Sequence, residues 1–97
     1  MLFDVIDKTM RQVFRDAGVQ VIYDFLEKNS RLKPEEIVEK PEAFSAGLER
    51  LLGSGALVIE KLILKNLYRK IDLKFEEKKG FAFSDYVKDI SLKGEVK

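Results

Sequence analysis

The chain has 97 residues, of which 45% are hydrophobic and 36% charged, and it carries a net charge of +1. This length suits one domain around one core. The chain has neither cysteine nor histidine, which excludes disulfides, thiolate nucleophiles, cysteine-bound zinc or iron–sulfur clusters and histidine-dependent catalysis. The sequence therefore predicts a protein that is not an enzyme and needs no cofactor.

The polar composition is typical of a protein from a hot habitat. Lysine and glutamate dominate the charged residues, and the chain has only two asparagines and two glutamines. Such a balance is common where charge networks are favourable and labile amides are avoided. Nothing resembles a signal peptide, and polar residues interrupt the apolar runs. We therefore expect a thermophilic, cytoplasmic protein that does not contact a membrane.

Residues 1–16 are predicted to form an amphipathic helix, because large apolar residues recur there at helical spacing. The rest of the chain already offers elements to cover a core, and surplus apolar surface marks an interaction site. We therefore expect this helix to join two copies in a symmetric homodimer, although it could instead fold back on its own core. The predicted interaction surface consists of Phe3, Ile6, Met10 and Phe14.

The next segments show clear helix boundaries. The helical period resumes after Gly18, so residues 16–18 either join two helices or bend a single one, and we expect two. Pro34 and Pro41 each suit the first turn of a helix. The first of these helices must be short, and the second should end at Gly53. Ala43 and Gly47 leave a smooth patch where another helix could approach closely.

Residues 54–71 form the longest periodic run and are predicted to be a central helix. The run is apolar on two sides, which is typical of a helix between neighbours. Basic residues occupy a gap between these sides, four residues apart, and could bind an anion such as a phosphate backbone. A solvated helix face explains them equally well. The predicted anion-binding stripe consists of Lys61, Lys65, Arg69 and Lys70.

Glu60 falls inside the wide apolar arc of this helix, so we expect a buried carboxylate. A buried carboxylate must be paired, hydrogen-bonded or neutralised. It could be a proton-transfer or ligand-binding group, but a structural salt bridge or hydrogen bond is the simpler interpretation. We expect Lys or Arg from another segment as its partner.

After Ile71 the apolar period changes from 3.6 to 2, around a turn at residues 77–80. This pattern predicts a β-hairpin that covers the helical core with its aromatic side chains. A short helix should follow at residues 85–90, and residues 91–97 should form a flexible tail. The predicted fold is thus a mainly α single domain, residues 1–97, of four to six helices around one central helix, with a small β-hairpin near the C-terminus.

Residues 18–90 resemble a family of small archaeal helical domains of uncharacterised function. The residues that carry the resemblance are Phe44, Leu48, Glu49, Leu51 to Gly53, Gly55, Ala56, Ile59 to Ile63, Leu67, Tyr68, Gly80, Phe81, Phe83 and Asp85 to Val87. Members of that family occur alone or attached to sensor-type proteins as output modules. The resemblance implies an interaction or signalling role and transfers no active site.

Three functions follow from these observations. The first is a non-catalytic module for protein interaction or signalling output, which binds an unknown protein partner. The second is weak nucleic-acid binding through the basic stripe of the central helix. The third is an enzyme or small-ligand carrier built on Glu60 with Tyr68 or Tyr86.

Overall fold

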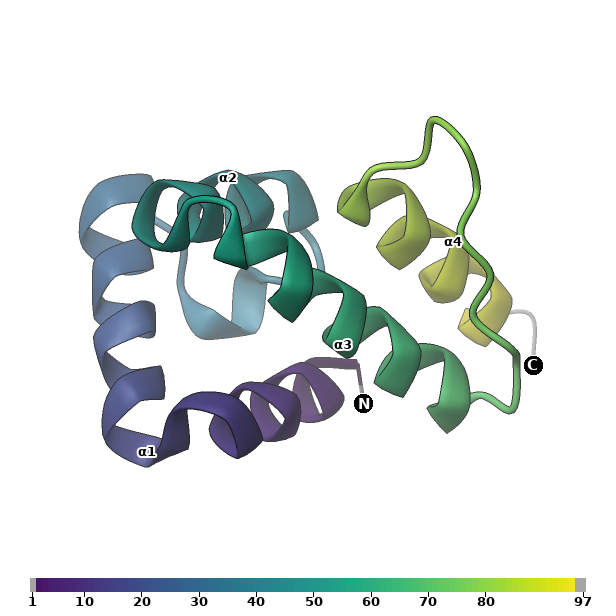
Figure 1. Ribbon diagram of the computed structural model, residues 1–97, viewed down its shortest axis with the longest axis horizontal. Coiled ribbons are helices and arrows are strands. Elements are labelled where there is room, and N and C mark those ends of the chain that lie inside the picture. The colour runs from purple at the N-terminus through teal and green to yellow at the C-terminus, as the bar shows by residue number, and fades with distance from the viewer. Residues whose placement is uncertain (1, 96–97) are drawn as a thin grey trace.

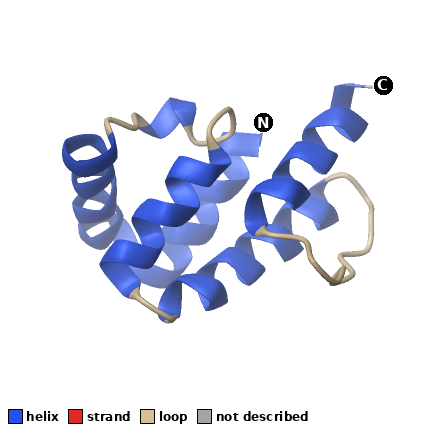
Figure 2. Ribbon diagram, turned by 90° about the horizontal axis from the view of Figure 1, so that it is seen from above, coloured by secondary structure: helices blue, strands red, loops and turns tan. Residues whose placement is uncertain are grey.

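The computed structural model describes residues 2–95, with side chains as far as residue 92. Within this range the chain is helical and contains no strand (Figure 2). The elements are α1 (Leu2–Ser30), the 3₁₀ turn η1 (Pro34–Glu36), α2 (Pro41–Leu52), α3 (Gly55–Lys70) and α4 (Phe83–Glu95). The prediction of a mainly α fold is therefore confirmed, and the four α-helices lie at the lower end of the predicted number.

The central element is α3, which packs against α1, α2 and α4. Figure 1 shows it running between α1 and α2 on one side and α4 on the other. Its buried face consists of Ala56, Ile59, Glu60, Ile63, Leu64, Leu67 and Tyr68. The two-sided burial predicted for this helix is only partly correct, because Leu57 and Val58 in its first turn are 65% and 66% exposed.

Helix α1 bends sharply at Arg15, so that it forms two arms (Figure 1). Arg15 has φ 62° and ψ 175°, a combination that lies outside the helical region and interrupts the hydrogen-bond ladder. Polar side chains connect the arms: the Tyr23 hydroxyl donates to Asp7 Oδ1 at 2.7 Å, and Arg11 donates to both Asp7 and Asp16. The bend therefore comes one residue before the joint predicted at residues 16–18.

The first arm of α1 docks on the chain's own core. Ile6 and Met10 are completely buried, and Phe3 and Phe14 are partly buried against the core. Ile6 and Met10 are therefore not available to a second chain, whereas Phe3 and Phe14 stay partly exposed, so only part of the predicted interaction surface lies on the outside of this fold. The apolar face that suggested a dimer instead joins α1 to α3, because burial of each such side chain contributes about 1.5–3 kcal/mol.

Helices α1 and α2 approach each other closely at Gly47, as the sequence predicts. Gly47 is buried, and a Cβ atom there would clash with Leu26 Cδ2 of α1. Helix α2 begins at Pro41 and ends at Leu52, and its C-cap residue Gly53 has φ 60°. Both boundaries agree with the prediction.

The predicted β-hairpin is wrong, because the chain stops α3 in a way that is incompatible with a strand at Ile71. Asp72 adopts a left-handed conformation with φ 58°. The Leu73 N–H donates to Tyr68 O at 2.9 Å and the Asp72 N–H to Arg69 O at 3.1 Å, which is the Schellman pattern of a helix end. Residues 73–82 then continue as a loop (Figure 2).

Tyr86 of α4 anchors this loop, in place of the strand pairing that we expected. The Lys78 N–H donates to the Tyr86 hydroxyl at 2.6 Å, and the hydroxyl donates to Lys78 O at 3.3 Å. The rings of Phe75 and Phe81 lie 5.3 and 5.1 Å from that of Tyr86. A two-stranded hairpin is marginal in water, so packing on α4 is the more stable arrangement.

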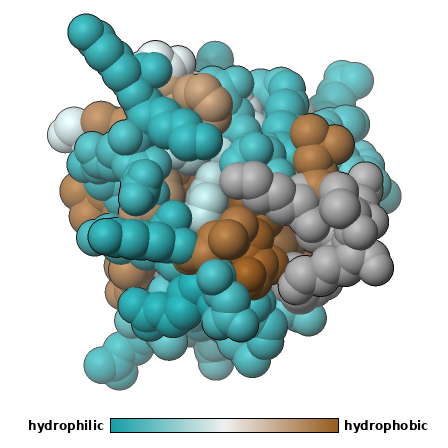
Figure 3. Space-filling model, turned by 90° about the vertical axis from the view of Figure 1, so that its right-hand side faces the viewer, coloured by the Kyte–Doolittle hydropathy of each residue, from teal (hydrophilic) through white to brown (hydrophobic). Residues whose placement is uncertain are grey.

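Helix α4 is longer than predicted. It begins at Phe83, where the Asp85 carboxylate accepts the N–H of Ala82 at 2.8 Å and so caps the helix. Residues 91–95 of the predicted tail are helical, and residues 96 and 97 lie outside the described part of the chain. No helix in residues 2–95 has the length and apolar character needed to cross a membrane. On the end face of the molecule an apolar patch near the centre borders on hydrophilic side chains, and further apolar atoms lie toward the edges (Figure 3).

Candidate functional site

An open groove of about 510 Å³ lies between α3, the loop and the beginning of α4, on the side of α3 that faces α4 in Figure 1. We call it the α3–loop groove. Its apolar lining consists of Leu57, Val58, Leu64, Phe75, Phe81, Ala82, Phe83 and Tyr86. Its polar lining consists of Ser45, Glu49, Glu60, Lys61, Glu77 and Lys78.

Three large apolar side chains of the groove are open to solvent. Leu57 is 65%, Val58 66% and Phe81 41% exposed. The aromatic side chains of the loop pack on Tyr86, and the first turn of α3 stays exposed at Leu57 and Val58. Single exposed apolar residues are common, whereas a group of them around a groove is typical of an interaction site.

Aromatic rings form one wall of the groove. Phe75 and Phe81 both pack against Tyr86 at angles of about 60°. The ammonium of Lys78 lies 5.1 Å from the centre of the Phe81 ring, within the range of a cation–π contact. The hydrogen bonds between the Tyr86 hydroxyl and the backbone of Lys78 hold this wall in place.

Glu60 lies at the inner side of the groove and is only 6% exposed. Its carboxylate accepts a hydrogen bond from Ser45 Oγ of α2 at 2.5 Å. None of the ion pairs among the described residues includes Glu60, so the expected Lys or Arg partner is replaced by a serine. Burial raises the pKa of Glu60; the Ser45 hydrogen bond opposes this rise, and the charge of Glu49 adds to it.

The rim of the groove is charged but partly neutralised. Lys61 Nζ lies 2.6 Å from Glu77 Oε1 and so ties α3 to the loop. The pair raises the pKa of Lys61 and lowers that of Glu77. Lys61 is therefore partly neutralised within the predicted anion-binding stripe by an ion pair whose side chains are 59% and 62% exposed.

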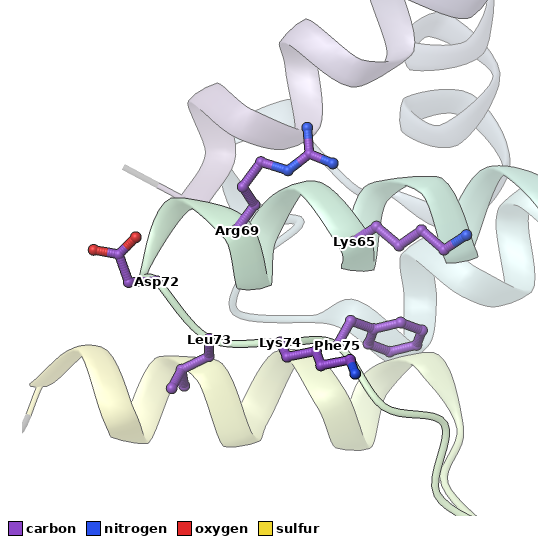
Figure 4. A pocket seen from close by; sticks show the side chains of 6 residues that line it. All are labelled: Lys65, Arg69, Asp72, Leu73, Lys74 and Phe75. Atoms are coloured by element: carbon purple, nitrogen blue, oxygen red, sulfur yellow. The ribbon is translucent and has the colours of Figure 1, made fainter.

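The rest of that stripe lies at the C-terminal end of α3. Lys65, Arg69, Asp72 and Lys74 surround a shallow depression of about 480 Å³ with Leu73 and Phe75 (Figure 4). In Figure 4 the charged ends of Lys65 and Arg69 point in different directions and away from Lys74, so they do not converge on one point. Basic side chains here also complement the negative end of the helix dipole.

A second depression, of about 450 Å³, brings α1 and α3 together beside the same helix end. Lys8 of α1 and Arg69 and Lys70 of α3 line it, with no carboxylate among its lining residues. Lys65, Arg69 and Lys70 take part in none of the ion pairs among the described residues. This end of the molecule can therefore attract anions, although without a built binding pocket.

The sequence showed the apolar residues of the groove as a second apolar side of α3, but we expected that side to be buried. Val58 belongs to the second apolar side of α3, which we interpreted as buried. Ser45 carried no signal, because a serine on the outer part of an amphipathic helix is ordinary. Among the described residues no group of three or more Asp or Glu side chains is arranged to hold a metal ion.

No family model, curated protein or solved structure matches the chain. The resemblance to the archaeal helical domains therefore stays a prediction, and the functional argument rests on the geometry of the groove.

Proposed function

We propose that the chain is a protein-interaction module, of the kind used for signalling output, without catalytic activity of its own and with a cytoplasmic location. Its contact surface is the α3–loop groove. The observation that carries this proposal is the exposure of Leu57, Val58 and Phe81 around one open groove. The resemblance to output modules agrees with it.

The composition of the groove favours a protein partner over a small molecule. Leu57 and Val58 protrude from the first turn of α3 with about two thirds of their surface open, so their full burial calls for a partner that extends beyond the groove. Protein interfaces combine such an apolar centre with a polar rim. Glu49, the Lys61–Glu77 pair and Lys78 provide that rim.

The energy available from this surface is sufficient for recognition. Full burial of a leucine or valine side chain contributes about 1.5–3 kcal/mol, and two thirds of each remains to be buried. Leu57 and Val58 together thus offer about 2–4 kcal/mol. A few side chains of this kind usually dominate the affinity of an interface.

The proposal is tested by comparing two substitutions of equally exposed valines. Val58 is 66% exposed in the groove, and Val21 is 62% exposed on α1, outside the groove. A partner is captured with the wild type from the native cell, purified, and titrated against Val58→Asp and Val21→Asp. We expect Val58→Asp to weaken binding at least about tenfold, which corresponds to about 1.4 kcal/mol, and Val21→Asp to leave it unchanged. Equal affinity of Val58→Asp and the wild type contradicts the proposal.

The proposal also includes a homodimer, with its contact at the groove instead of at α1. Because Ile6 and Met10 are buried, we place the contact with a second copy at the groove rather than at the first arm of α1. Sedimentation of the wild type and of Val58→Asp tests this version. A dimer that persists in Val58→Asp places the contact elsewhere.

Nucleic-acid binding is the second candidate function. The observation in its favour is the group of Lys65, Arg69 and Lys70, none of which is ion-paired with a described residue, next to Lys8 and Lys74. Binding through phosphates must weaken steeply with salt. Titration of duplex and single-stranded DNA at two salt concentrations, with Arg69→Ala as the variant, decides this: affinity that does not depend on salt or on Arg69 removes the candidate.

A further inference from the structure

The most unusual group in the molecule is the carboxylate of Glu60. It lies on the central helix, is 6% exposed, and has a serine hydroxyl as its polar partner instead of a cation. A glutamine at this position could accept the same hydrogen bond from Ser45 through its side-chain oxygen. The hydrogen bond from Ser45 therefore does not by itself require a negative charge at this position.

The cations that line the groove are already engaged. Lys61 is paired with Glu77, and the ammonium of Lys78 lies over the ring of Phe81. Glu60 and Glu49 take part in none of the ion pairs among the described residues. Glu60 on the inner side of the groove and the exposed Glu49 on its rim therefore carry carboxylates that no ion pair among the described residues neutralises.

The aromatic wall is suited to a positively charged group. Lys78 shows that the Phe81 ring accepts an ammonium at 5.1 Å, and Tyr86 and Phe75 extend the wall beside it. A lysine or arginine side chain has an apolar stem and a charged end. Such a side chain can place its stem along the rings and its charged end toward the carboxylates.

We propose that the α3–loop groove receives a lysine or arginine side chain from an otherwise apolar segment of the partner protein, with Glu60 pairing with its charged end. This inference rests on the proposed function and names the chemistry of its partner. The negative inner part of the groove and its apolar wall are complementary to this one kind of side chain. An acidic segment is disfavoured for the same reason.

The buried position of Glu60 strengthens this pairing. Removing a carboxylate from water is costly, and this cost usually offsets most of the attraction in a buried ion pair. Here the folded chain has already removed most of Glu60 from water, since the residue is only 6% exposed. An incoming cation therefore gains the attraction without that part of the cost.

Three six-carbon probes of similar shape test the inference: n-hexylammonium, n-hexanol and hexanoate. Each is titrated into the isotopically labelled chain while the amide signals of the groove residues are followed by NMR. For the wild type we expect hexylammonium to bind at least about tenfold more tightly than hexanol, and hexanoate to bind most weakly. In Glu60→Gln the preference for hexylammonium over hexanol should disappear while the affinity for hexanol is retained.

Two further variants make the test specific. Lys78→Ala frees the face of Phe81 and removes a positive charge, so it should raise the affinity for hexylammonium. Glu27→Gln removes a negative charge from an exposed position of α1 and should leave the preference unchanged.

The outcomes separate this inference from the proposed function. If hexanol shifts the groove signals but hexylammonium has no advantage, or if the advantage survives in Glu60→Gln, the inference is overturned and the apolar docking surface stands. If no probe shifts the groove signals, the groove binds no apolar group and the proposed function fails with the inference.

Discussion

The contact between α1 and α2 predicts that Gly47→Ala destabilises the protein, although the same change stabilises most helices. A new Cβ atom at residue 47 would clash with Leu26 Cδ2. Leu26 is 1% exposed, so its side chain cannot move into solvent to avoid the clash. The change also brings Ser30 Oγ within 3.5 Å of the new atom, which is ordinary contact. The cost therefore comes from Leu26.

The magnitude follows from two opposing effects. Replacing glycine by alanine inside a helix contributes about 1 kcal/mol of stability, whereas overpacking a tight core costs about 1–3 kcal/mol. The net result is a loss of up to about 2 kcal/mol, which lowers the Tm by about 4–8 °C per kcal/mol in a domain of this size. Leu26→Val removes the clashing atom at a cost of its own of about 1 kcal/mol.

In the Leu26→Val background Gly47→Ala should therefore change sign and stabilise the protein by up to about 1 kcal/mol. Urea unfolding followed by circular dichroism measures all four members of this cycle. Gly55→Ala is the matched control, because its Cβ would meet Leu52 Cβ at an ordinary 3.8 Å, and it should not destabilise. If Gly47→Ala stabilises the protein equally in the wild-type and Leu26→Val backgrounds, as glycine-to-alanine changes do in an uncrowded helix, the helices do not touch at Gly47.

Three further predictions follow from single residues. Arg15→Gly should stabilise the protein by about 1–3 kcal/mol in thermal unfolding, because φ 62° with ψ 175° is a conformation that only glycine adopts without strain; a loss of stability contradicts the strained bend. Tyr86→Phe should cost about 0.5–1.5 kcal/mol and accelerate hydrogen exchange at the Lys78 amide, and unchanged exchange there would show that Tyr86 does not hold the loop. Glu60→Gln should stabilise the protein increasingly as the pH rises above 4.5, the ordinary value for this carboxyl.

The sign of the Glu60 prediction follows from proton binding. Burial raises the pKa of Glu60 in the folded chain, so the folded state holds its proton more tightly than the unfolded state does. Stability from this group is fully present below the unfolded pKa and is lost as the pH rises through the folded pKa. Glutamine does not titrate, so parallel pH profiles of wild type and variant between about pH 4 and 8 would show that Glu60 is not desolvated.

Local sequence signals predicted the helical part of the fold because they act over a few residues. Pro41 and Gly53 fix the ends of α2 through the geometry of the backbone itself. The central helix was recognisable from its apolar period. These features need no information about distant parts of the chain.

The prediction of a hairpin was wrong because long-range packing determines the conformation of residues 73–82. The alternation through Leu73 and Phe75 is real, but Tyr86 binds the backbone of Lys78 and collects the aromatic rings on α4. No local pattern reveals that a tyrosine eight residues away will replace a partner strand. The left-handed Asp72 that ends α3 was equally hidden, since Gly or Asn is the usual signal there.

Only part of the candidate site could be predicted, because the rest also depends on long-range packing. A carboxylate inside an apolar arc identified Glu60 from the sequence alone. Its partner Ser45 and the exposure of Leu57 and Val58 depend on how α2 and the loop are placed around α3, which periodicity does not specify. Periodicity likewise did not specify whether the apolar face of α1 packs on its own core or on a second chain.

The central claim is that the α3–loop groove is the surface through which this protein binds its partner. The most direct measurement is an NMR titration of the labelled chain with the partner captured by the wild type, in which every amide signal is followed. Our account predicts that the large changes cluster at Leu57, Val58, Glu60, Phe81 and their neighbours, while the surface around Val21 stays unchanged. Changes that cluster at the basic end of α3 or on α1, with the groove signals unmoved, would contradict it.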